Sequence, residues 1–119
     1  MKRILPTLMI VLFFGCYKDE LPPTINITSP ANNQMVPGGQ LLSVVATITD
    51  NDGMHMIHLS VTDNTTGGHL VHFEEHFDGK SYHLNQSFTP QSGRNYTIDI
   101  EATDHAENVG DKSIHISAN

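Results

Sequence analysis

The chain has one cysteine and no tryptophan, and only 6 of its 119 residues are lysine or arginine. A single cysteine excludes an internal disulfide, so stability must come from a hydrophobic core, for which about 100 residues are enough. The scarcity of basic residues excludes binding to nucleic acid phosphates, which requires a basic stripe. The sequence also has no glycine-rich phosphate loop and no defensible nucleophile–base pair, so nothing in it indicates an enzyme.

The chain has one long apolar run, at its N-terminus, and this run is too short to cross a bilayer. It extends over residues 4–14, follows two basic residues and ends at Gly15 and Cys16, whereas a transmembrane helix needs about 20 apolar residues. The length of the run and its basic flank predict a secretory signal peptide over residues 1–15.

The only cysteine directly follows a small residue at the end of this run. The arrangement resembles a bacterial lipoprotein signal, in which the peptidase cuts before the cysteine and the thiol receives the lipid. The leucine that usually stands three residues before the cysteine lies one place earlier, at Leu12. The resemblance implies a membrane anchor on Cys16 and a tether over residues 16–21. An ordinary secretory signal and an uncleaved anchor stay open as alternatives.

The residues after Cys16 bear on the destination of the protein. Lys18-Asp19-Glu20 resembles the acidic export tag that sends some Gram-negative lipoproteins to the outer face of the outer membrane. We therefore expect a surface-exposed outer membrane lipoprotein, with the periplasmic face as the alternative. Removal of the signal peptide takes away Lys2 and Arg3 and leaves four basic and thirteen acidic side chains. The net charge of the remaining chain is then −9, which favours the binding of cations.

From residue 22 onward, short alternating segments recur about every ten residues, which is typical of an all-β sandwich. Turn residues at 51–53 and 78–79 are expected to end the second and fourth strands, and residues 29–33 and 37–39 are expected to be turns. Seven strands are predicted, marked by Ile25 and Ile27; Leu42 to Ile48; Ile57 to Val61; Val71 to Phe77; Tyr82 to Phe88; Tyr96 to Ala102; and Ile114 and Ile116.

Three stretches resemble the bacterial immunoglobulin-like domains of secreted proteins: residues 23–32, 46–53 and 96–108. The resemblance implies a seven-stranded immunoglobulin-like Greek-key sandwich over residues 22–119. It also implies that Tyr96 is a core tyrosine whose hydroxyl holds a nearby turn. This fold hosts adhesins, spacers and binding modules alike, so it leaves the function open. The middle of the chain departs from the general pattern and resembles small histidine-rich bacterial lipoproteins of uncharacterised function.

Eight histidines are unusually many for a chain of this length, and several fall on predicted strand faces. If the third and fourth strands form a hairpin, Glu74 faces His58, while Met56 and Ser60 face His76 and His72. We predict that this outward face binds one zinc or copper ion through His58, His72, Glu74 and His76. If the sixth strand lies beside the third, Asp99 and Glu101 point to the same face. A merely polar sheet surface, or a register slip that scatters the cluster, is the alternative.

Acidic and amide side chains gather after the second and sixth predicted strands, in loops that share one end of such a sandwich. Oxygen ligands of this kind suit calcium. The residues predicted for calcium are Asp50, Asp52, Asp104 and Asn108. Ordinary turn chemistry explains the same residues, and the remaining histidines, at 55, 69, 83, 105 and 115, are interpreted as separate surface residues.

Residues 72–76 also match the H-x-x-E-H pattern of zinc proteases, but that pattern needs a helix, and the segment belongs to a predicted strand. Two non-enzymatic functions therefore remain. One is a metal-binding envelope lipoprotein. The other is an adhesive or spacer module with a protein or glycan partner, in which the histidines have no metal role.

Overall fold

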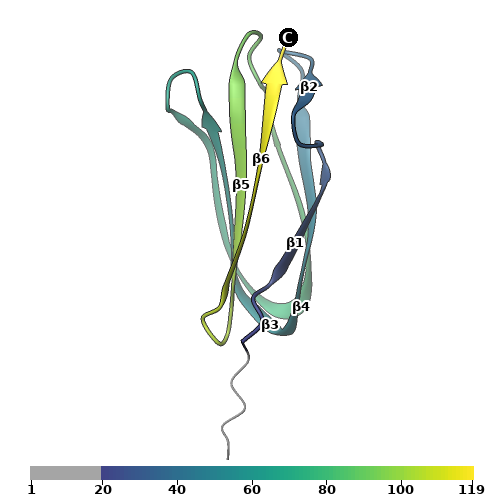
Figure 1. Ribbon diagram of the computed structural model, residues 1–119, viewed down its shortest axis with the longest axis vertical. Helices are drawn as coiled ribbons and strands as arrows, with labels where there is room; N and C mark the ends of the chain where they lie inside the picture. The colour runs from purple at the N-terminus through teal and green to yellow at the C-terminus, as the bar shows by residue number, and fades with distance from the viewer. Residues whose placement is uncertain (1–19) are drawn as a thin grey trace, which may run out of the picture.

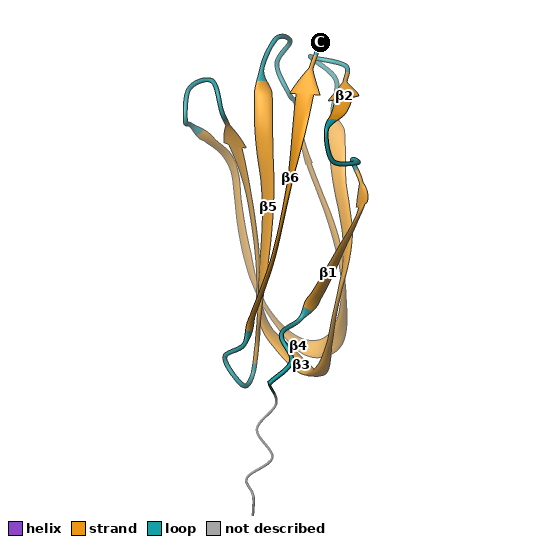
Figure 2. Ribbon diagram, viewed as in Figure 1, coloured by secondary structure: helices purple, strands orange, loops and turns teal. Residues whose placement is uncertain are grey.

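The alternating apolar pattern forms strands throughout residues 20–119, the part of the chain that the computed structural model describes. The predicted signal peptide and Cys16 lie outside the described residues. No helix occurs in residues 20–119 (Figure 2), and hence none there is long and apolar enough to cross a membrane. The strands are β1 (Thr24–Ser29), β2 (Gln34–Val36), β3 (Leu42–Asp63), β4 (His69–Phe88), β5 (Asn95–Asp104) and β6 (Val109–Ala118).

The strands form two layers, and the long strands β3 and β4 belong to both of them (Figure 1). Residues 42–49 of β3 pair with β1 and the end of β4, whereas residues 54–63 pair with β5 and the start of β4. β6 continues the second layer beside β5, and β2 joins β6 as the one parallel pair in the described residues. The expected all-β immunoglobulin-like sandwich is thereby confirmed.

Residues 51–53, which were expected to end a strand, form a bend within β3 instead. The register with β4 shifts across this stretch, and the carboxylate of Asp50 accepts the two amides released from the ladder, at 3.0 and 2.8 Å. Residues 78–79 lie in the matching bend of β4. Turn residues inside two paired strands act as a bulge that redirects the pair. The seven predicted strands therefore correspond to five continuous ones.

The remaining strand, β2, lies between two segments that were expected to be turns. It has three residues, of which only Val36 is buried. A segment this short shows no alternation in the sequence, so its pairing with β6 could not be predicted.

The predicted inward faces build the core. On β4, the inward residues Val71, Phe73 and Phe77 are only half-buried because the start of this strand pairs with β3 alone among residues 20–119. Among the other residues predicted to face inward, Ile25 and Phe88 are 8% and 7% exposed, and Ile27, Leu42 and Tyr82 are partly buried. The remaining predicted core residues are less than 5% exposed: Val44, Ala46, Ile48, Ile57, Leu59, Val61, Leu84, Tyr96, Ile98, Ile100, Ala102, Ile114 and Ile116.

Tyr96 is the core tyrosine that the family resemblance implied. It is 1% exposed, packs edge-on against Phe88 with ring centroids 5.5 Å apart, and its hydroxyl accepts a hydrogen bond from the Gln91 amide at 2.8 Å. The hydroxyl therefore holds the turn before β5, as expected.

Removing this hydroxyl is expected to destabilise the domain. Tyr96→Phe leaves the Gln91 amide without its acceptor, which we expect to lower the free energy of unfolding by about 1–2 kcal/mol, measured by equilibrium urea denaturation. Tyr82→Phe is the matched control, because the half-buried Tyr82 hydroxyl donates to the exposed Glu75, and its removal should cost less. Equal unfolding midpoints for Tyr96→Phe and the unmodified protein would show that the hydroxyl does not stabilise the turn before β5.

Candidate metal centre

The β3–β4 hairpin determines which outward side chains face one another. His58 pairs with Glu74, and Met56 and Ser60 pair with His76 and His72. This register is the predicted one. The register is set by the tight loop that joins the two strands, in which the Asp63 amide donates to the Gly68 carbonyl at 2.8 Å. Between the histidines and this loop, the pairing register of β3 with β4 shifts only once.

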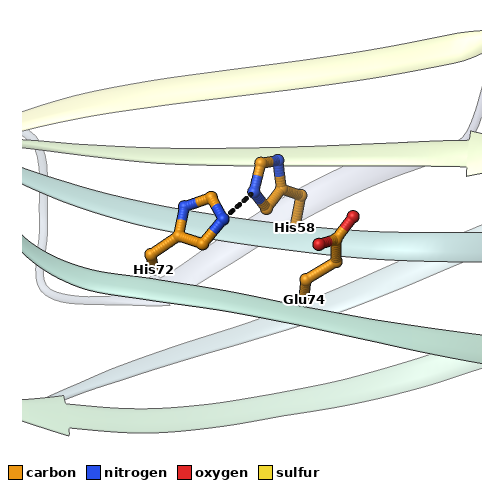
Figure 3. A group of neighbouring side chains, drawn as sticks. All are labelled: His58, His72 and Glu74. Carbon is orange, nitrogen blue, oxygen red and sulfur yellow. Dashed lines mark hydrogen bonds between the residues drawn. The ribbon is translucent and has the colours of Figure 1, made fainter.

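Three side chains of this face come together. The Nε2 atoms of His58 and His72 lie 3.4 Å apart, and their rings are perpendicular with centroids 4.6 Å apart. Each of these residues and Glu74 offers a ligand atom within 4.8 Å of the other two. Figure 3 shows the two imidazoles pointing toward each other from β3 and β4, with the Glu74 carboxylate beside them. His58 is half-buried and the other two are exposed, so solvent reaches the group.

The spacing of the two nitrogens suits a tetrahedral metal ion. Zinc binds imidazole nitrogen at about 2.1 Å, so two ligands at the tetrahedral angle have nitrogens about 3.4 Å apart. The Nε2 atoms of His58 and His72 have this separation. A carboxylate oxygen of Glu74 lies within reach as a third ligand, which would leave a fourth tetrahedral position to water.

His76 was predicted as a fourth ligand, but the structure does not place it in this group. Residues 72 and 76 lie on one strand, four positions and about 13 Å apart, too far to share an ion centred between His58 and His72. The His76 ring lies instead beside His55, with centroids 5.3 Å apart. Because residues 72–76 form part of β4, the helical protease pattern is not formed either.

Acidic side chains of β5 and β6 extend the same face. Glu101 pairs with His58 and Asp99 with Ser60, as the sequence predicted for neighbouring strands. On β6, the pKa of Asp111 is raised, first by its hydrogen bond to Asp99, then by burial, and further by the charges of Asp99 and Glu101. Asp99, Glu101 and Asp111 thus place acidic side chains on the strands beside the histidines, where negative charge attracts cations.

Three of the four residues predicted for calcium, Asp50, Asp104 and Asn108, form hydrogen bonds within their own turns. Asp50 is 6% exposed and accepts two backbone amides through Oδ2, whereas its Oδ1 has no hydrogen-bond partner. Asp104 accepts the backbone amide and the side-chain amide of Asn108 at 2.8 and 2.9 Å. Asp50, Asp52 and Asp104 do not form a ligand group within residues 20–119, so calcium binding stays a prediction.

A family model described as Bacterial Ig domain matches residues 23–116. No protein with a curated description is similar to this chain in sequence. Among solved structures, the fibronectin(III)-like modules of Clostridium thermocellum CbhA are 22% identical with a TM-score of 0.56, covering 82% of this chain and 47% of that one. The chain thus spans about half the length of that structure.

Two further solved structures are similar at lower scores. The CARDB domain of a Pyrococcus furiosus protein, in complex with di-metal ions, is 14% identical with a TM-score of 0.49, covering 82% of this chain and 94% of that one. A β-glucosidase from Listeria innocua, in complex with glucose, is 12% identical with a TM-score of 0.46, covering 81% and 16%. At these identities the likeness concerns the fold alone.

Proposed function

We propose that this chain, which belongs to the bacterial Ig domain family, is a non-enzymatic lipoprotein of the cell envelope that binds a transition-metal ion. The ion is held by His58 and His72, with Glu74 as third ligand. The observation that carries the proposal is the 3.4 Å separation of the two Nε2 atoms, which suits two nitrogens on one tetrahedral ion.

The ligand types favour zinc or Cu(II). Imidazole and carboxylate suit both ions, whereas Cu(I) prefers sulfur ligands. The nearest sulfur on this face belongs to Met56, which pairs with His76 rather than with a residue of the group. Zinc is therefore the first ion to test.

The proposed location rests on sequence outside the described residues. Lipidation of Cys16 would anchor the domain to the outer membrane, and Lys18-Asp19-Glu20 favours its outer face. A surface protein of net charge −9 over residues 16–119 would concentrate cations near its metal site, which suits capture or buffering of zinc at the envelope.

A zinc titration followed by ¹⁵N NMR of the imidazoles tests the site directly. We expect the resonances of His58 and His72 to shift with added Zn²⁺ and to return on addition of a chelator, while those of His83 and His115 stay in place. His83 and His115 are exposed and lie outside the group, so they report non-specific binding. Unchanged His58 and His72 resonances in excess zinc would leave the adhesive or spacer function as the better proposal.

A further inference from the structure

Three histidines from distant parts of the sequence meet at the bend of the long strands. His55 lies in β3, His76 in β4, and His105 in the turn after β5. Both Met54 and Ile57 are fully buried, so the two residues between them point away from the core. The pairing of β3 with both neighbouring strands shifts register at this point, which marks a local β-bulge. The bulge brings His55 to the surface beside His76.

Two of the three ring pairs have the spacing of rings around one metal ion, although the ligand nitrogens of the three residues are not all within 4.8 Å of one another. The ring of His55 lies between those of His76 and His105, with centroid distances of 5.3 and 5.6 Å. A zinc ion bound at about 2.1 Å from nitrogen lies about 3.2 Å from each ring centre, so two rings at the tetrahedral angle have centres about 5.3 Å apart. The side chains of His55 and His76 are exposed, so rotation about their side-chain bonds can turn their nitrogens toward the ring of His105.

A carboxylate fixes the orientation of His105. Its Nε2 lies 2.9 Å from Asp78 Oδ1, and its backbone amide donates to the Gly53 carbonyl at 3.2 Å. Histidines that bind metals usually donate their other ring N–H to a carboxylate, which fixes the tautomer and raises ligand basicity. Because Asp78 accepts the proton on Nε2 of His105, the Nδ1 atom of the same ring is the one available to bind a metal ion.

The cluster also has a pocket of its own. His55, His76 and His105 line a shallow hollow of about 270 Å³ together with Phe77 and Asp78. Phe77 packs edge-on against Tyr82, with ring centroids 4.9 Å apart, which supports the apolar side of the hollow. The space accommodates an ion and its bound water while remaining open to solvent.

We propose a second metal site, in which His55, His76 and His105 bind a transition-metal dication such as Zn²⁺ and Asp78 is a positioning residue. The site is separate from the one at His58, because the histidines that the two sites take from β4 lie about 13 Å apart along the strand. The protein then holds two ions at once, and the second site does not depend on the first.

Zinc stoichiometry in paired variants tests the proposal on the full-length purified protein. After equilibrium dialysis against buffered micromolar Zn²⁺, elemental analysis is expected to give two ions per chain. The double variant His55→Ala/His105→Ala should hold one ion, and the matched control His83→Ala/His115→Ala should hold two. Each changed side chain is exposed, so equal melting temperatures in chelator should verify that the variants fold.

The outcomes separate the two sites. If His55→Ala/His105→Ala binds as much zinc as the unmodified protein, the second site is wrong. If His58→Ala/His72→Ala loses no zinc while His55→Ala/His105→Ala loses one ion, the second site stands and the first fails. Asp78→Asn should lower only the affinity of the second ion, by about 10- to 100-fold. An unchanged affinity in Asp78→Asn would remove its positioning role.

Discussion

Replacing His58 with alanine is expected to weaken zinc binding at the β3–β4 site by at least about 100-fold. Loss of an outer-shell partner already costs about 10- to 100-fold, and His58 is a direct ligand that faces both other members of the group. A 100-fold loss corresponds to about 2.7 kcal/mol. The measurement is a competition titration against a chelator of known affinity, in the His55→Ala/His105→Ala background, where only this site remains.

Two further variants make the comparison specific. Glu74→Gln retains the size of the side chain but removes its charge, so we expect a smaller loss, of about tenfold. His83→Ala changes an exposed histidine of the same strand, β4, outside the group, and should bind zinc as tightly as the background protein. Equal affinities in His58→Ala and His83→Ala would mean that the histidines form only a polar surface.

The pH dependence of the same titration counts the ligating histidines. Imidazole binds metal only when neutral, and histidine side chains ordinarily titrate near about pH 6.5. Two protons compete with zinc at a site with two ligating histidines, so in acid the logarithm of the affinity should fall with a limiting slope of two per pH unit. In His58→Ala the slope should drop to one.

The face of the sheet could be predicted because it depends on local alternation and a short hairpin. Burial of Ile57, Leu59 and Val61 fixes which residues of β3 face outward, and a one-residue slip would reverse that choice. The loop after Asp63 then sets the pairing of His58 with Glu74. The alternation and the hairpin loop both lie within about 20 consecutive residues, so the sequence alone was enough to predict which side chains of this face meet.

The bend could not be predicted, and the second histidine cluster depends on it. Residues 51–53 have the composition of a turn that ends a strand, and only pairing across two layers makes them a bulge in a continuous one. His105 is fifty positions away from His55 in the sequence, and no spacing rule connects the two residues. The structure therefore assigns to a cluster two histidines that the sequence indicated as separate surface residues.

Replacing Asp63 with asparagine is expected to loosen the loop that sets the hairpin register. Asp63 is 2% exposed, and its carboxylate accepts Arg94 Nη1 at 2.6 Å and the Thr65 amide at 2.9 Å. Its backbone also bonds to Gly67 and Gly68 in the loop. Asparagine retains the shape but loses the ion pair, so we expect the melting temperature at pH 7 to fall by several degrees.

The sign of the pH dependence identifies the ion pair as the cause. Burial alone raises the pKa of Asp63, but the hydrogen bond and charge of Arg94, with the amides of Thr65 and Thr66, lower it on balance below the usual 3.8. A carboxyl group whose pKa is lower in the folded state stabilises the protein above the unfolded pKa, and this stabilisation is lost as pH falls through the folded value.

The difference in melting temperature between Asp63→Asn and the unmodified protein should therefore be constant near neutral pH and narrow below about pH 4. The exposed Asp52→Asn is the control and should have the melting temperature of the unmodified protein at pH 7. A difference for Asp63→Asn that persists undiminished into acid would assign its effect to packing rather than to charge.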